Sequence, residues 1–321
     1  MIPRLRFSLL GHPVRHSVSP AMCTAAFASL GMPHVYTAID VPSESGLGRI
    51  VDDLRTGMLA GCNVTLPFKR SVLELADRCA DSAAEVGAAN VLAREPDGRV
   101  VAHNTDAEAL AQELGAAWAA RALPGAPRQR QRAAIIGGGG AALAALVACR
   151  RLGFQLVFMT SRSWANTELV YDAPTARLAR ELGALTAPWP HSDDTAPTGK
   201  LTQALRLQWG ELVAGADCVI QATSAGMKGG DPGEDLTGVV PWEKLPDHAL
   251  AYDLVYNPTE TPFLRAAKER GLDAMGGLGM LVRQAALSIH LWTGQTPPLE
   301  PMRKAAEDAL AAGAARGGAR R

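Results

Sequence analysis

The segment Gly61–Lys69 (GCNVTLPFK) contains three kinds of polar side chain that could act on one small molecule. In an extended strand, Asn63 and Thr65 alternate with apolar residues, so their side chains point to the same face. Pro67 cannot donate a ladder hydrogen bond and is predicted to end the strand just before Lys69. An amide, a hydroxyl and an ammonium group would then converge at the carboxyl end of a strand, where open α/β sheets bind ligands. The simpler alternative is a strand end followed by a surface lysine.

A carboxylate that could work with Lys69 follows the next predicted strands, in the run His103-Asn104-Thr105-Asp106. Asp106 precedes a predicted alanine-rich helix, 107–120, where an acidic residue could simply complement the helix dipole. It could equally face Lys69, because a carboxylate that orients an ammonium group makes a plausible proton-transfer unit. General acid–base help of this kind is worth about 10² to 10⁴ in rate.

Two hydroxyl side chains, Ser17 and Ser19, follow the first predicted strand, 6–10. Ser19 stands before Pro20 and is predicted to be the N-cap of a helix over 21–30. Two hydroxyls at the positive end of a helix could also hold a carboxylate. The residues alone leave both interpretations open.

A glycine-rich turn lies between a predicted buried strand, 133–136, and a predicted helix that ends near Arg151. This context makes the G-x-G-x-x-A pattern a dinucleotide-binding signature, since missing side chains let the backbone approach a pyrophosphate. The alternative is a glycine turn without a ligand. We predict that the cofactor contacts are Gly137, Gly138, Gly139, Gly140 and Ala141.

The end of the next predicted strand, 155–160, indicates which dinucleotide is bound. An NAD site usually places an acidic residue there, but this chain has Ser161, Arg162 and Ser163. A guanidinium group flanked by hydroxyls suits a 2′-phosphate, so the sequence favours NADP over NAD. The alternative is a solvated surface arginine.

Length and composition fit a two-domain α/β enzyme. The chain has 321 residues, 47% of them hydrophobic and 20% charged, with no net charge and a pI near 7.1. Without a basic stripe before the last residues, nucleic acid is an unlikely partner. We expect no signal peptide, no membrane span, and five buried, reduced cysteines, as in a cytoplasmic protein.

The polar, proline-rich run 123–132 is predicted to be a domain boundary. We predict a substrate-binding domain over 1–120, completed by C-terminal helices over 281–312, and a dinucleotide-binding domain over 121–280. The tail 313–321 is predicted to be disordered. His191, Asp193 and Asp194 fall in a loop-like stretch, and we predict no metal site.

The combined pattern resembles the shikimate/quinate dehydrogenase family. The matching pieces occur in family order over roughly residues 5–295: His16–Pro20, Gly61–Lys69, Asn104–Asp106, the glycine turn, Ala222–Met227, Asp253–Pro262 and Gly277–Met280 with Gln284. The resemblance implies two α/β domains around a cleft, an N-terminal substrate domain and a C-terminal Rossmann NADP-binding domain. The implied reaction is the reversible NADPH-dependent reduction of 3-dehydroshikimate to shikimate, in aromatic amino acid biosynthesis.

The resemblance also implies roles for single residues. Lys69 and Asp106 would transfer the proton at the reacting oxygen. The substrate contacts would be Ser17, Ser19, Asn63, Thr65, Asn90, Tyr256 and Gln284, with the two serines and Thr65 on the carboxylate side. Leu254 and Gly277 would lie near the nicotinamide, and Thr223 would be a further cofactor contact. A small-molecule substrate is the expected partner of a monomer or homodimer.

Three features depart from the family pattern. Cys23-Thr24 replaces a usual His-Asn pair, His103 replaces a frequent Tyr, and the region 164–210 is longer than usual. These departures leave open a quinate/shikimate or aminoshikimate dehydrogenase. From a different class, the chain could be a non-catalytic dinucleotide-binding regulatory protein, although such a protein would need neither Lys69 nor Asp106.

Overall fold

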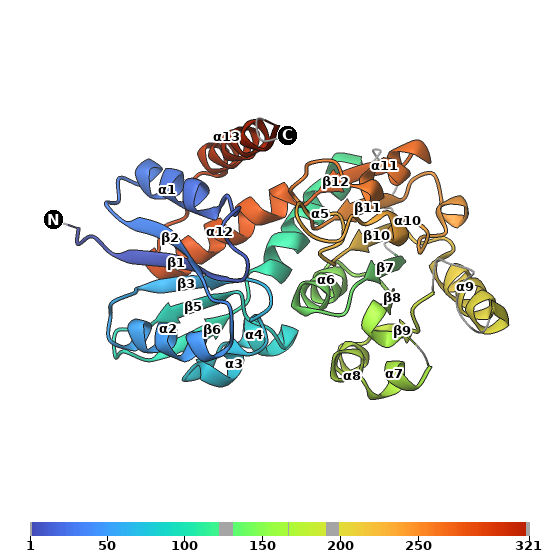
Figure 1. Ribbon diagram of the computed structural model, residues 1–321, viewed down its shortest axis with the longest axis horizontal. Coiled ribbons are helices and arrows are strands. Elements are labelled where there is room, and N and C mark those ends of the chain that lie inside the picture. The colour runs from blue at the N-terminus through green and yellow to red at the C-terminus, as the bar shows by residue number, and fades with distance from the viewer. Residues whose placement is uncertain (1, 122–130, 166, 191–198, 319–321) are drawn as a thin grey trace. The chain divides into compact units, whose positions relative to one another are not determined.

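The structure is a computed structural model that describes residues 2–121, 131–165, 167–190 and 199–318 (Figure 1). The chain forms two compact units. One unit comprises Met1–Ala109 and Gly279–Arg321, and the other comprises Leu110–Leu278. The predicted class of two α/β units, one of them of the Rossmann type, is confirmed by the sheets described below.

The first unit contains a six-stranded mixed sheet with strand order β2-β1-β3-β5-β6-β4. Its strands are β1 Arg6–Gly11, β2 Val35–Asp40, β3 Gly61–Val64, β4 Arg78–Cys79, β5 Val91–Arg94 and β6 Val100–His103. Its helices are α1 Ser19–Ser29, α2 Ser45–Arg55, α3 Val72–Leu75, α4 Asp81–Val86, the start of α5 Asp106–Arg121, α12 Leu278–Thr293 and α13 Leu299–Gly318.

The strand directions bring several chain segments to one edge of this sheet. Strands β1 and β3 are parallel, so they end at the same edge. Strand β5 runs antiparallel to both β3 and β6, so β5 begins at that edge and β6 ends there. The residues that follow β1, β3 and β6 and those that precede β5 are therefore neighbours, although they are far apart in sequence.

Helices cover both faces of the first sheet. The ring of Phe7 on β1 stacks on Trp292 of α12 with 4.9 Å between centroids, and it lies 5.2 Å from the ring of Phe27 of α1. Leu10, three residues along the strand, faces the other way and joins the cluster buried under α2. Helix α2 presents its buried residues at helical spacing, namely Leu47, Ile50, Val51 and Leu54.

The second unit contains a six-stranded parallel sheet with strand order β12-β11-β10-β7-β8-β9. Its strands are β7 Arg132–Ile136, β8 Leu156–Thr160, β9 Leu185–Ala187, β10 Cys218–Gln221, β11 Leu250–Asp253 and β12 Asp273–Gly276. Its helices include α6 Gly140–Arg151, α7 Thr167–Asp172, α8 Pro174–Glu181, α9 Gly199–Val213, α10 Glu234–Thr237 and α11 Pro262–Glu269.

The strand order of the second unit reverses between β7 and β10. The chain moves outward from β7 through β8 to β9, and then returns to the other side of β7 to add β10, β11 and β12. Doubly wound sheets of this kind bind dinucleotides at the carboxyl ends of the strands beside the reversal. The predicted Rossmann unit is therefore present.

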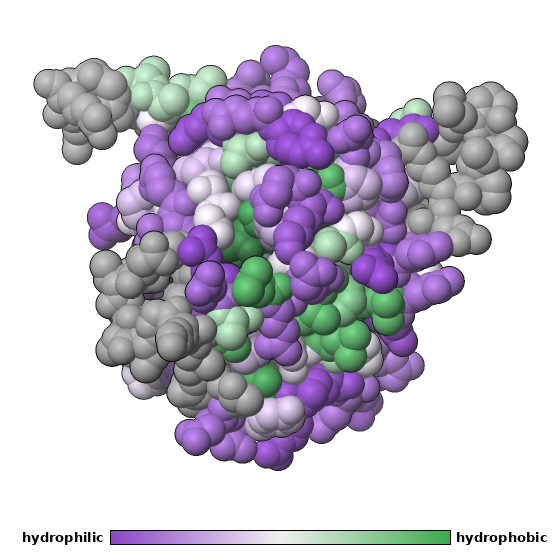
Figure 2. All heavy atoms as spheres, turned by 90° about the vertical axis from the view of Figure 1, so that its right-hand side faces the viewer, coloured by the Kyte–Doolittle hydropathy of each residue, from purple (hydrophilic) through white to green (hydrophobic). Residues whose placement is uncertain are grey.

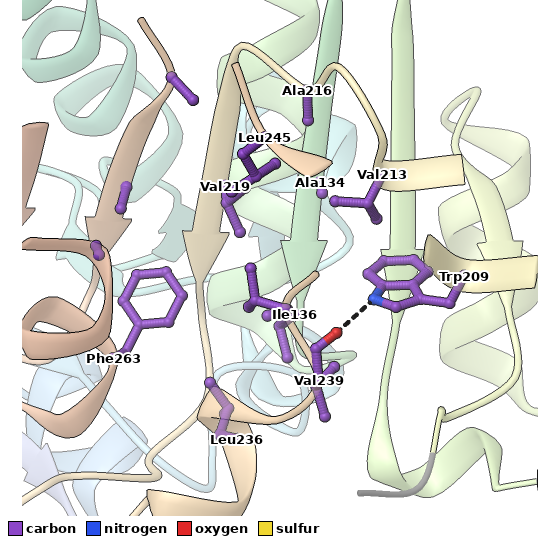
Figure 3. Close-up of a cluster of buried hydrophobic side chains, with 14 of the residues drawn as sticks. Ala134, Ile136, Trp209, Val213, Ala216, Val219, Leu236, Val239, Leu245 and Phe263 are labelled. Atoms are coloured by element: carbon purple, nitrogen blue, oxygen red, sulfur yellow. Dashed lines mark hydrogen bonds between the residues drawn. The ribbon is translucent and has the colours of Figure 1, made fainter. Parts of the chain in front are cut away.

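A large hydrophobic cluster holds α9 and the loop after α10 against this sheet (Figure 3). Trp209 of α9 is almost fully buried, and its indole N–H donates a hydrogen bond to the carbonyl oxygen of Val239 at 2.9 Å. Ile136 of β7 and Phe263 of α11 belong to the same cluster. Burying a large ring together with its polar atom fixes the indole in one orientation.

Several local expectations differ from the structure. Strand β3 ends at Val64, so Thr65 lies beyond the strand. Ser19 is the first residue of α1 rather than its N-cap, and its hydroxyl bonds Ser17 instead of a backbone N–H. Cys79 is exposed, in contrast to the predicted burial, whereas the other four cysteines are buried and all five are free thiols.

The C-terminal helix and the region 164–210 also differ from expectation. Helix α13 continues to Gly318, so the prediction that the tail is disordered from residue 313 is wrong for residues 313–318. The four alanines among residues 311–318 favour the helix, since alanine is the best helix former. Helices α7 and α9 and strand β9, none of which was predicted, lie wholly or mainly in the region 164–210. His191, Asp193 and Asp194 lie outside the described residues.

Candidate active site

Lys69 and Asp106 form a largely buried ion pair in the first unit. The Lys69 ammonium donates a hydrogen bond to Oδ2 of Asp106 at 2.5 Å. Their side chains are only 15% and 5% exposed, respectively, so water competes little for this contact. Lys69 follows β3 and Asp106 follows β6, and the strand directions place both segments at the same edge of the sheet. The pairing expected from the residue types is therefore present.

The carboxylate of Asp106 is held by more than Lys69. Its Oδ1 accepts a hydrogen bond from Nδ2 of Asn90 at 2.9 Å. The Asn104 side chain fixes the start of α5, because its Oδ1 accepts from the backbone N–H groups of Asp106 at 3.0 Å and Ala107 at 3.2 Å. Asn104 Nδ2 in turn donates to the carbonyl oxygen of Ala88. Asn104 therefore positions the backbone from which Asp106 extends.

We expect Asn104→Ala to reduce kcat by about 3- to 10-fold and to destabilise the protein by about 0.5–2 kcal/mol, the usual cost of a lost helix cap. The rate falls because the Asp106 carboxylate loses its fixed backbone. Asn104→Ser keeps a hydroxyl acceptor for the helix start and is the control, since it should recover part of both losses. A lower melting temperature with an unchanged kcat would show that Asn104 has no part in positioning the carboxylate.

The Asn90 amide connects the ion pair to α12. Its Oδ1 accepts a hydrogen bond from the backbone N–H of Thr105 at 2.7 Å, and its Nδ2 lies 3.2 Å from Oε1 of Gln284. The Thr105 hydroxyl lies 2.9 Å from the same Nδ2 and donates to the carbonyl oxygen of Gln284. Asn90 and Gln284, predicted to contact the substrate, are thus brought together with Asp106, predicted to take part in proton transfer.

Asn63 is buried and its amide already has partners within the protein. Its Oδ1 accepts from the hydroxyl of Tyr36 at 2.7 Å, and its Nδ2 donates to Ser288 Oγ at 2.8 Å and to the carbonyl oxygen of Asn90. Sequence reasoning missed Tyr36 and Ser288. Ser288 lies four residues after Gln284 and therefore shares its helix face, a spacing that could have identified it.

Ser17, Ser19 and Thr65 lie in the segments that follow β1 and β3. The Ser17 hydroxyl donates to Ser19 Oγ at 3.1 Å and accepts from the backbone N–H of Ser19 at 3.2 Å. Thr65 is anchored to β1 through its backbone N–H, which donates to the carbonyl oxygen of Leu10. A Cβ atom on Gly11 would overlap the Thr65 side chain, so only glycine permits this close approach.

The predicted dinucleotide turn has the backbone shape that a pyrophosphate site needs. Gly137 has φ +137°, a conformation that favours glycine, and a Cβ there would lie 2.9 Å from the carbonyl oxygen of Ala222 after β10. Helix α6 begins at Gly140, with Gly139 as its N-cap. A helix N-terminus at the reversal point of a parallel sheet fits an anionic cofactor group. Ala141 lies in the first turn of α6.

Thr223 lies across this turn, on the segment after β10. The buried Gln221 side chain orders that segment by accepting from the backbone N–H of Thr223 and donating to the carbonyl oxygen of Ala225. The Thr223 hydroxyl accepts from the Ala225 N–H at 3.1 Å. The close approach of Ala222 to Gly137 places Thr223 beside the glycine turn, as the prediction for cofactor contact requires.

Ser161, Arg162 and Ser163 directly follow β8. The two serine hydroxyls lie 3.0 Å apart, and a Cβ on Gly138 would lie 2.9 Å from the Ser161 oxygen, so this segment touches the glycine turn. The Arg162 side chain is 53% exposed and pairs with Asp231 at 2.5 Å. A half-exposed guanidinium group at this strand end fits a 2′-phosphate.

Leu254 and Gly277 are brought into direct contact in the second unit. A Cβ on Gly277 would overlap the carbonyl group of Leu254, so glycine is required at this approach. The Gly277 N–H donates to the carbonyl oxygen of Val255 at 3.1 Å. Tyr256 lies on the same segment and is partly buried.

Asp253, the last residue of β11, fixes the segment that follows this strand through side-chain hydrogen bonds. It is fully buried, and its carboxylate accepts from the Val255 N–H at 2.9 Å and from the Thr261 hydroxyl at 2.5 Å. Thr261 also caps α11 by accepting from the Leu264 N–H. Burial raises the pKa of Asp253 to about 7, although these hydrogen bonds oppose the rise.

This pKa predicts a pH effect on stability. A carboxyl group whose pKa is about 7 when folded and 3.8 when unfolded binds its proton more tightly in the folded state. Its contribution to the free energy of unfolding is therefore lost as the pH rises from about 4 to about 7. We expect Asp253→Asn to become more stable relative to the wild-type protein over this window, as measured by urea unfolding at several pH values. The exposed Asp172→Asn is the control, and a similar pH dependence in it would refute the role of Asp253.

A surface hollow of about 330 Å³ is lined by residues of α9 and of the loop after α10, among them Arg206, Leu207 and Val239. Figure 2 looks onto the side that carries α9 and shows hydrophobic atoms in patches among hydrophilic ones. None of the predicted substrate or cofactor residues lines this hollow.

Within the described ranges, no group of three or more His, Cys, Asp or Glu side chains is arranged to hold a metal ion. Each described helix is also too short or too polar to span a membrane.

The two units together define a dinucleotide-dependent oxidoreductase. The second unit has the sheet order and the glycine turn of a Rossmann unit. The first unit supplies a buried ammonium–carboxylate pair within a network of amides and hydroxyls.

Comparisons with known proteins agree with this class. Residues 9–92 match the shikimate dehydrogenase substrate binding domain, and residues 277–307 match the shikimate 5′-dehydrogenase C-terminal domain. The chain is 34% identical over 300 residues to the shikimate dehydrogenase (NADP(+)) of Methanopyrus kandleri, covering 92% of this chain and 93% of the relative. The chain therefore belongs to the shikimate dehydrogenase family, as the resemblance in sequence implied.

Solved structures point the same way. Shikimate 5-dehydrogenase from Thermus thermophilus, in complex with NADP(H) and shikimate, is similar with a TM-score of 0.73 and 33% identity over 95% of this chain and 99% of that chain. Quinate dehydrogenase from Corynebacterium glutamicum, in complex with NAD, has a TM-score of 0.72 but only 25% identity over 94% and 98% of the two chains. The quinate alternative is not favoured, because the curated relative with 34% identity is a shikimate dehydrogenase (NADP(+)).

Proposed function

We propose that this protein catalyses the reversible NADP-dependent reduction of 3-dehydroshikimate to shikimate, a step of aromatic amino acid biosynthesis. The observation that carries this proposal is the buried pair of Lys69 and Asp106, set within the polar edge of the first sheet. The family membership and the glycine turn of the second unit support it.

In this mechanism Lys69 gives a proton to the substrate oxygen when the carbonyl group is reduced and takes it back in the reverse reaction. NADPH, when bound, supplies the hydride. Asp106 orients the ammonium group, since its Oδ2 holds Lys69 while its Oδ1 is fixed by Asn90. Because the proton donor is already oriented before the reaction, the barrier does not include the cost of reorganising solvent around it.

Other side chains of the network would orient the ring. Asn90 and Gln284 present amides beside the ion pair and would bond ring hydroxyls. Ser17, Ser19 and Thr65 would bond the substrate carboxylate through neutral donors. Contacts of Asn63 and Tyr256 with the substrate remain predictions, and the Asn63 amide would first have to give up partners within the protein.

The cofactor would be held by the second unit. The glycine turn at 137–140 and the start of α6 would receive the pyrophosphate, and Arg162 with its flanking serines would receive the 2′-phosphate. We assign substrate binding to residues 1–120 with the helices over 281–312, and cofactor binding to residues 121–280. We place the protein in the cytoplasm, as a monomer or homodimer.

Steady-state rates with shikimate, quinate and aminoshikimate, each with NADP and with NAD, test this proposal. Reduced nicotinamide is followed by its absorbance. We expect shikimate with NADP to give the highest kcat/KM. A higher value for quinate or aminoshikimate would contradict the substrate assignment. Binding of NADP without turnover of any substrate would instead support a regulatory protein.

A further inference from the structure

An ion pair lies at the end of β8, where a Rossmann unit contacts the ribose 2′ group that distinguishes NADP from NAD. Arg162, after β8, bonds Oδ2 of Asp231 at 2.5 Å. In Rossmann units the ribose 2′ position lies at the end of this second strand, where an acidic residue bonds the hydroxyl of NAD and an arginine binds the phosphate of NADP. This chain has both kinds of group there. The arginine is Arg162, which directly follows β8, and the acidic residue is Asp231, which lies in the loop after β10.

The loop after β10 presents Asp231 in a fixed geometry. Its Oδ1 accepts from the backbone N–H of Gly233 at 2.9 Å, and its own carbonyl oxygen accepts from the Gly226 N–H at 2.8 Å. Arg162 and the Gly233 N–H hold the pKa of the Asp231 carboxyl below its usual value, so the group is ionised at neutral pH. The side chain is 35% exposed and remains accessible to a ligand.

The positive charge at this strand end is limited. Between Ser161 and Ala176 the sequence contains one basic residue, Arg162, and two acidic residues, Glu168 and Asp172. The next basic residues are Arg177 of α8 and, in the loop that carries Asp231, Lys228, so Arg162 is the basic residue that directly follows β8. A 2′-phosphate must approach an arginine that is already neutralised and must do so beside a negative charge.

We propose that Asp231 is a specificity-determining residue that weakens the preference for NADP over NAD. It competes with the 2′-phosphate for Arg162 and repels that phosphate. Its two oxygens already accept from Arg162 and from the Gly233 N–H, but a carboxylate has further lone pairs that can accept from the 2′-hydroxyl of NAD. This inference rests on the proposed cofactor site. It predicts a protein that uses NAD appreciably, although Arg162 is present.

Calorimetric binding of 2′,5′-ADP and of 5′-AMP to the full-length protein tests this inference without any substrate. Asp231→Asn keeps an oxygen that can accept from the Gly233 N–H but removes the charge. We expect the affinity of the variant for 2′,5′-ADP to rise about 3- to 10-fold, as for relief of a partly exposed repulsion. Its affinity for 5′-AMP should not rise, because the variant gains nothing at the 2′-hydroxyl and loses a carboxylate acceptor there. Higher salt should shrink the gain, because the charges are exposed to solvent.

Asp235→Asn, on the exposed side of α10, is the matched control because it removes the same charge from the same loop region, and it should leave both affinities nearly unchanged. Unchanged or weaker 2′,5′-ADP binding by Asp231→Asn, or equal gains for both ligands, would overturn the role of Asp231 and leave the proposed function standing. Binding of neither ligand by the wild-type protein would overturn the cofactor assignment together with this inference.

Discussion

Lys69→Ala is expected to lower kcat by about 10² to 10⁴-fold, the usual worth of a positioned acid–base group. The variant loses the only side-chain donor seen on Oδ2 of Asp106 among the described residues, and with it the proposed source of the proton. Cofactor binding should be unchanged, because the predicted cofactor residues lie in the other compact unit. Steady-state rates with shikimate and NADP give the first quantity, and calorimetry with NADP gives the second.

Arg70→Ala is the matched control, since it removes an exposed positive charge from the neighbouring position. Its kcat should stay within about twofold of the wild-type value, as expected for a surface substitution. If Lys69→Ala lost affinity for NADP but kept the wild-type reaction rate, Lys69 would not be the residue that transfers the proton.

Arg162→Ala is expected to raise the KM for NADP by about 10- to 100-fold and to change the KM for NAD little. A hydrogen bond between charged groups is worth about 1.5–3 kcal/mol, and each 1.4 kcal/mol is a factor of about ten in affinity. The ion pair with Asp231 must be given up when the phosphate binds, which favours the lower end of this range. Steady-state kinetics with varied NADP and NAD measure both constants.

Arg177→Ala, an exposed arginine on α8, provides the comparison for a general loss of positive charge in this unit. It should leave the ratio of the two KM values unchanged. If Arg162→Ala raised the KM for NAD as much as that for NADP, Arg162 would not bind the 2′-phosphate.

The pairing of Lys69 with Asp106, the proposed catalytic pair, could be anticipated because both residues follow strands that end at the same edge of the sheet. Lys69 after β3 and Asp106 after β6 meet because β5 runs antiparallel to both strands. The glycine turn could be predicted for a similar reason, since its strand–turn–helix context is local in sequence.

The partners of that pair were harder to predict. Tyr36 lies on the edge strand β2 and reaches Asn63 across β1, which places Tyr36 level with Gly61, two residues before Asn63 on the same face of the sheet. The role of Asn104 depends on side-chain hydrogen bonds to a helix start, and residue types alone do not show which polar group of a run caps the helix. Asp231 could not be linked to Arg162, because the two residues are 69 positions apart in the sequence and only the fold brings them together.

The region 164–210 shows a further limit of predicting helices from sequence alone. Helix α9 lacks a sharp apolar stripe in sequence, yet tertiary burial of Trp209 and Val213 holds it against the sheet (Figure 3). Packing of this kind overrides local propensity and is not visible in a short window of residues.

The central claim is that the Lys69–Asp106 pair acts on the oxygen of the substrate ring. A crystal structure of the protein with bound shikimate tests it most directly. We expect the ring hydroxyl that is oxidised to lie within about 3 Å of the Lys69 ammonium and within reach of Asp106. A ring that binds elsewhere, with Lys69 and Asp106 still paired only to groups of the protein, would contradict the account.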